Sequence, residues 1–136
     1  MIQANELRIG NIFWENYGGY KVITAIGCNS VGDMKNTVSA RGIGFTLSGQ
    51  YDCDAISPVL LTPEILEKCG FEKANDRYGG YLSPVFNSGR IRLSWYSETD
   101  DDWYWYNGCW NTKIKHLHQL QNLYFSLTGE ELTINL

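Results

Sequence analysis

The chain is poor in the features that mark special classes of protein. It has three prolines and two histidines, and no apolar run approaches the ~20 residues needed to span a bilayer. Its N-terminus lacks a basic stretch followed by an apolar one, which argues against a secretion signal. Four cysteines, none in a CxxC pair or at zinc spacing from a histidine, predict reduced, mostly buried thiols in a cytosolic protein.

Catalytic signatures are also missing from the sequence. There is no Gly-x-Ser-x-Gly elbow, phosphate-binding loop or His-Glu-x-x-His motif. A cysteine nucleophile needs a neighbouring base, and Cys109, beside the Asn107-Gly108 turn, is the cysteine we expect nearest to solvent. We therefore predict a protein that is not an enzyme, has no catalytic residue and uses no cofactor.

Two groups of residues invite a metal-binding interpretation. On a helix, His116 and His118 point roughly 200° apart, so we expect them at a helix start or on the surface; in a strand they would share a face. The run Asp100-Asp101-Asp102 lacks the ligand alternation, glycine and distant Glu of a calcium loop. We interpret it as a solvated acidic turn and predict no metal site.

Size, charge and composition limit the remaining choices. The 136 residues fit a single domain, long enough to bury roughly two-thirds of its unfolded surface. A net charge of −4 argues against non-specific binding to nucleic acid. With nine Tyr, five Trp, five Phe and 14 Gly, the composition is typical of a folded protein rich in strands and tight turns.

The first 60 residues read as short strands separated by turns. Alternating apolar residues, with glycines at the expected turns between them, predict five strands, at residues 12–14, 20–26, 37–40, 43–47 and 51–56. Residues 27–35 are polar and are expected to form a loop. Five short strands in about 50 residues suggest a small barrel of the SH3-like kind.

Two helices are predicted in the second half of the chain. Thr62 is a good N-cap, and Pro63 suits the first helical position. Gly70 suits the left-handed backbone conformation that ends many helices, after which Phe71 is expected to fold back over the helix. The second helix should run over about residues 116–128 and stop at Gly129. Its apolar stripe has three- and four-residue spacing: Leu117, Leu120, Leu123, Tyr124 and Leu127. Residues 132–134 are predicted as an edge strand.

Between the helices the pattern is that of an antiparallel meander. Residues 78–86 and 90–96 read as two strands, with Trp103-Tyr104-Trp105-Tyr106 and residues 109–114 as a hairpin around Asn107-Gly108. The predicted fold is α+β: an SH3-like small β-barrel at residues 1–60, then a helix and an antiparallel β-meander packed by a C-terminal helix at residues 61–136, all in one domain.

Several blocks of sequence resemble an uncharacterised family of small proteins. They are Glu6 to Asn11 (ELRIGN), Ile56-Ser57-Pro58 with Leu61-Thr62, Gly70-Phe71-Glu72, and His118 to Phe125 followed by Leu127 to Leu132 (HQLQNLYF, LTGEEL). The last block is the most specific. Members are frequent in Bacteroides-type gut bacteria, their phages and mobile elements. The resemblance implies an accessory protein of such an element in the cytoplasm of a bacterial host; it implies no activity.

The aromatic hairpin is the main candidate for a binding site. One of its faces must build the core, so the opposite face, also aromatic, would lack cover and call for a partner. A flat ligand such as a nucleobase could stack there, and neighbouring arginines could hold its phosphate. The predicted ligand-binding residues are Arg90, Arg92, Tyr96, Tyr104, Tyr106 and Trp110. Core packing or a homo-oligomer interface are the alternatives for these rings.

Two functions follow from this candidate site. In the first, the protein binds and sequesters a small phosphate-bearing ligand, such as a nucleotide signal of host defence; the pair Arg90 and Arg92 favours it. In the second, the protein is an interaction module that occupies a host protein through the aromatic face. The net acidity and the lack of a Gly-rich phosphate cradle favour this second reading. We rank ligand binding first.

Overall fold

The protein has a mixed α+β architecture with two antiparallel sheets. The computed structural model describes residues 6–15, 19–27, 37–43, 49–53, 56–75, 80–87, 89–95, 102–106 and 111–136. Two compact units emerge: Met1–Val59 with Leu117–Asn122, and Leu60–His116 with Leu123–Leu136. The first six residues of helix α2 (Leu117–Thr128) therefore belong to the first unit. The prediction from sequence assigns the whole helix to the sub-structure at residues 61–136.

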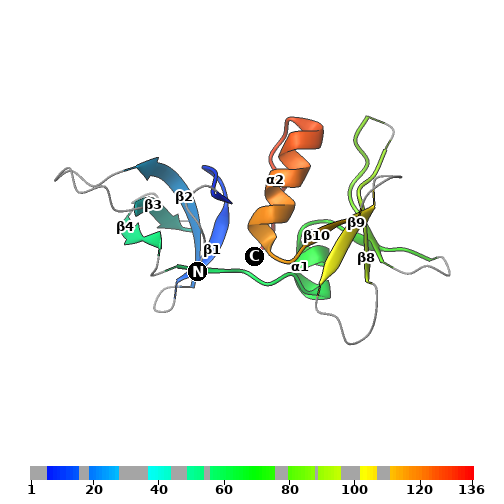
Figure 1. Cartoon of the computed structure of the whole chain (residues 1–136), viewed down its shortest axis with the longest axis horizontal. Helices are drawn as coiled ribbons and strands as arrows, with labels where there is room; N and C mark the ends of the chain where they lie inside the picture. Colours follow the sequence, from blue (N-terminus) through cyan, green and yellow to red (C-terminus); the bar gives the residue numbers. More distant parts are fainter. Residues whose placement is uncertain are drawn as a thin grey trace. The chain divides into compact units, whose positions relative to one another are not determined.

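The first unit contains a five-stranded sheet that curls strongly into a half-barrel (Figure 1). Its order is β4-β3-β2-β1-β5, and each neighbouring pair is antiparallel. A register shift between Ile23 and Ala25 marks a β-bulge, a device that increases local twist. The strands are β1 (Ile12–Glu15), β2 (Gly19–Gly27), β3 (Thr37–Gly42), β4 (Gly49–Asp52) and β5 (Ile56–Pro58).

Two predicted strands of this unit need correction. The strand predicted at 51–56 is divided, because β4 ends at Asp52 and β5 starts at Ile56. These two strands occupy opposite edges of the sheet. The strand predicted at 43–47 begins instead with a turn at Ile43, and residues 44–48 lie outside the described residues.

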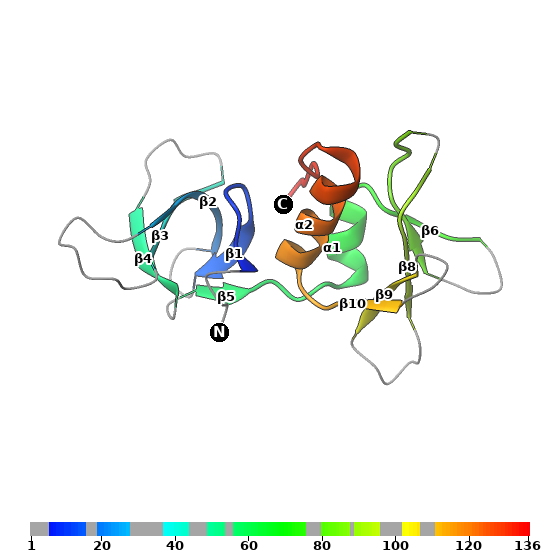
Figure 2. The ribbon, with the colours of Figure 1, turned by 45° about the horizontal axis from the view of Figure 1, so that its top comes forward.

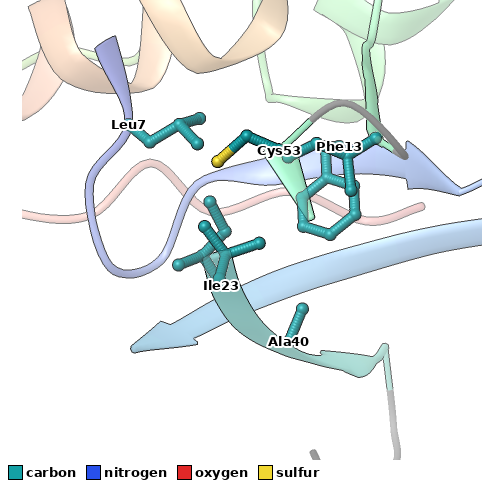
Figure 3. Packing of buried hydrophobic residues seen from close by; sticks show 7 residues of the cluster. Leu7, Phe13, Ile23, Ala40 and Cys53 are labelled. Atoms are coloured by element: carbon teal, nitrogen blue, oxygen red, sulfur yellow. The ribbon is translucent and has the colours of Figure 1, made fainter. Parts of the chain in front are cut away.

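The core of the first unit is a cluster of side chains from four strands and the segments before β1 and after β4 (Figure 3). Phe13 and Ala40 are completely buried, and the ring of Tyr51 meets Phe13 edge-on with centroids 6.3 Å apart. Burying each large side chain contributes roughly 1.5–3 kcal/mol. The members are Leu7, Phe13, Ile23, Val38, Ala40, Cys53 and Ile56.

A buried set of hydrogen bonds ties the segment before β1 to the start of α2. The side chain of Gln121 accepts from the Ile12 backbone N–H at 2.9 Å and donates to the Gly10 carbonyl at 3.0 Å. The Asn122 side chain accepts from Asn11 Nδ2 at 2.9 Å. Gln121 is 2% exposed, so these bonds satisfy groups that would otherwise be costly to bury.

Charged residues extend the same network. Arg8 donates from Nε to Asn122 Oδ1 at 3.2 Å, and the Asn122 amide donates to the Glu6 carbonyl at 2.9 Å. The carboxylate of Glu6 lies 3.4 Å from His118 Nε2. We call this group, Glu6, Arg8, Asn11, His118, Gln121 and Asn122, the N-terminal polar network. His118 is therefore buried at the helix start, and the surface position considered for it is wrong.

The second unit contains the other five-stranded sheet, in the order β10-β9-β8-β7-β6. It is a consecutive antiparallel meander, as the sequence predicted. Of the strand predicted at 78–86, residues 78–79 lie outside the described residues and Tyr81–Leu82 form a strand, whereas β6 was not predicted. The strands are β6 (Glu72–Lys73), β7 (Tyr81–Leu82), β8 (Arg92–Trp95), β9 (Trp103–Tyr106) and β10 (Asn111–Ile114).

Helix α1 (Pro63–Lys68) has the ends that the sequence predicted. Thr62 Oγ1 accepts from the Ile65 N–H at 3.3 Å, and Pro63 starts the helix. At the other end Gly70 has φ +79°, and the Phe71 N–H donates to the Leu66 carbonyl at 2.9 Å. Both Figure 1 and Figure 2 show α1 beside the second sheet.

Trp103 is the central residue of the second core. It is 1% exposed, its indole N–H donates to the Leu61 carbonyl at 3.2 Å, and its ring meets Tyr81 edge-on at 5.6 Å. Leu93 and Ile114, on the strands either side of β9, are buried with it. One face of the predicted aromatic hairpin therefore does build a core.

The C-terminal region differs from the prediction made from its sequence in two respects. Gly129, with φ +73°, ends α2 as predicted, but Leu127 is 39% exposed although it belongs to the apolar stripe. Residues 132–134 form no strand; Leu132 is buried and the Asn135 N–H donates to the Lys68 carbonyl at 3.0 Å. Within the described residues, neither helix is long and apolar enough to cross a membrane.

Gly80 offers a test of the second sheet. It has φ +99°, and an added Cβ would collide with the carbonyl oxygen of Leu93 in β8. Gly129 has φ +73° but open space around the same position. We expect Gly80→Ala to cost at least about 3 kcal/mol and Gly129→Ala about 1–2 kcal/mol in urea unfolding. Equal losses would show that the β7–β8 approach is not as close as described.

His118 makes the first unit sensitive to acid. Burial lowers the pKa of His118 below its ordinary value, and the hydrogen bond and charge of Glu6 oppose part of this shift. The unfolded chain therefore binds this proton more readily, so the stability from neutral His118 is complete above about pH 6.5 and is lost as the pH falls below it.

We expect the urea midpoint of the wild-type protein to fall between about pH 7 and pH 5. The slope should flatten in His118→Gln, which removes the titrating group. His116→Gln is the control, because it also deletes a histidine but lies outside the N-terminal polar network. Superimposable pH profiles for wild type and His118→Gln would contradict the assignment.

Candidate functional site

The face of the second sheet opposite Trp103 collects polar and charged side chains. In its middle a straight row crosses three strands, because Ser94 pairs with Tyr104 and Tyr104 pairs with Lys113. Arg92 lies two residues from Ser94 on β8 and so shares its face. We call this surface the outer face and define it by residues that are half-buried or exposed: Glu72, Leu82, Arg92, Ser94, Tyr104 and Lys113.

The structure brings two of the six predicted ligand-binding residues together on this face, Arg92 and Tyr104. Arg90 lies before β8 and its guanidinium is 3.4 Å from the carboxylate of Glu72, an exposed ion pair at the β6 edge of the sheet. Tyr106 belongs to β9, but its side chain is not among those described; Tyr96 and Trp110 also lie outside the described residues. Among described side chains, Tyr104 is the one ring on this face.

Beside Tyr104, a buried carboxylate holds two lysines. Asp102 forms an ion pair with Lys113, and Lys115 Nζ lies 3.9 Å from its other oxygen. The Asp102 side chain is 9% exposed, whereas those of Lys113 and Lys115 are 54% and 47% exposed. The side chains of the two lysines are therefore far more exposed than the carboxylate that they share.

This arrangement corrects the interpretation of the acidic run as a solvated turn. Asp102 is buried because the pairing of β9 with β10 places lysines from the neighbouring strand around it. Asp100 and Asp101 lie outside the described residues. The sequence did not predict lysines beside Tyr104, because a two-residue turn at Asn107-Gly108 would pair Tyr104 with Asn111. In the structure four residues lie between the two strands, and Tyr104 pairs with Lys113.

The described charges on and beside the outer face sum to the opposite sign from the charge of the whole chain. Four described cations lie on or beside the outer face, Arg90, Arg92, Lys113 and Lys115, against two carboxylates, Glu72 and Asp102. The difference is +2, whereas the complete chain has a net charge of −4. A cationic surface on an acidic protein favours an anionic ligand through local contacts rather than through net charge.

The described cysteines do not supply a nucleophile. Cys53 and Cys69 are both buried, and burial raises the pKa of the Cys69 thiol to about 12, so it stays protonated at neutral pH. Cys109 and Cys28 lie outside the described residues. Within the part of the chain that the structure describes, no three His, Cys, Asp or Glu side chains are grouped to hold a metal ion.

Comparison of the chain with family models, with curated proteins and with solved structures gave no match. The resemblance carried by the N-terminal and C-terminal blocks thus stays a prediction. In the structure those two blocks meet in the N-terminal polar network, where Arg8 and Asn11 bond to Asn122. Their residues therefore have a structural role in the first unit, and the outer face is formed from other parts of the chain.

The buried carboxylate should matter more to stability than the exposed one. Asp102→Asn removes a charge that two lysines share, and we expect a loss of about 1–3 kcal/mol in urea unfolding. Glu72→Gln breaks the exposed pair with Arg90 and should cost less than about 0.5 kcal/mol. Similar losses in the two variants would mean that Asp102 is as well solvated as Glu72.

Proposed function

We propose that this protein is a non-catalytic binding protein that holds a small phosphate-bearing, ring-containing ligand, such as a nucleotide, on the outer face. The observation that carries the proposal is the position of Tyr104, half-buried in the centre of the sheet, with Lys113 directly opposite and Arg92 on the neighbouring strand. A ring and two cations on one sheet are the groups that bind a base and its phosphate.

The chemistry of each group suits this ligand. Stacking of a base on an aromatic side chain contributes roughly 1–3 kcal/mol. The planar guanidinium of Arg92 can bind two phosphate oxygens at once, whereas the ammonium of Lys113 acts as a point charge. The Lys113 side chain is 54% exposed although it pairs with Asp102, so a phosphate can approach it from solvent.

The composition of the outer face favours a small anion over a protein partner. Protein interfaces concentrate aromatic residues and are poor in charge at their centres. The described outer face instead surrounds its ring with Ser94, Lys113 and Arg92. A host protein bound through this face is the alternative, and the experiment below separates the two.

The proposal includes a setting. The ELRIGN and HQLQNLYF blocks support an accessory protein of a phage or mobile element, acting in the cytoplasm of a bacterial host and sequestering a nucleotide signal of host defence. The curled five-stranded sheet supports an SH3-like identity for the first unit, with the C-terminal helix packing the meander. Association into a homo-oligomer belongs to the same proposal.

Native mass spectrometry of protein purified from a bacterial host, followed by calorimetric titration with ADP and with adenosine, tests the function. We expect a retained mass of a few hundred daltons or measurable ADP binding, and much weaker binding of adenosine, which lacks phosphate. Tyr104→Leu and Arg92→Ala should each weaken ADP binding by about tenfold, equivalent to about 1.4 kcal/mol.

Arg41→Ala is the matched control, since Arg41 lies in the first sheet. Unchanged affinity in Tyr104→Leu and Arg92→Ala would remove the ligand from the outer face. If no nucleotide binds and the purified protein carries only a polypeptide partner, the host-protein alternative replaces the proposal.

A further inference from the structure

We draw no further inference here: the strongest candidate, the edge-on pair of Trp14 and Tyr20 on the face of the first sheet opposite its core, leaves Trp14 41% exposed, but nothing in the structure shows what covers it.

Discussion

The side-chain amide of Gln121 is the interaction on which the first unit depends. It accepts from the N–H of Ile12, the first residue of β1, and donates to the Gly10 carbonyl, joining segments more than a hundred residues apart in sequence. Because the site is buried, an unpaired donor or acceptor there would cost about 1–3 kcal/mol. The start of β1, and with it the pairing of β1 with β2 and β5, is therefore fixed by a residue of the last helix.

This network also explains why the two ends of the chain carry its most distinctive sequence blocks. Arg8 and Asn11 from one block bond to Asn122 from the other, and Glu6 contacts His118. Of these residues, His118 invited a metal-binding interpretation from the sequence, together with His116. Asn11, His118 and Gln121 are buried, and the bonds within the network stabilise the first unit.

The outer face could be predicted in part. Alternation along β8 and β9 correctly separated the buried Leu93 and Trp103 from Arg92 and Tyr104, because side chains of a strand alternate between faces. Arg90 could not be assigned, since its pairing with Glu72 depends on β6, a strand of two residues that local pattern does not mark. Lys113 and Asp102 required the register of β9 with β10, which a four-residue connection sets.

The sequence by itself determined the α+β class, the two helices with their glycine ends, and the alternation of the strands, because caps, glycines and periodicity act over a few residues. Tertiary structure alone decided which polar residues are buried, the division of the strand predicted at 51–56, and the lysines beside Tyr104. Those features depend on contacts between residues far apart in the chain, whose pairing is chosen by burial of the whole unit rather than by local preference.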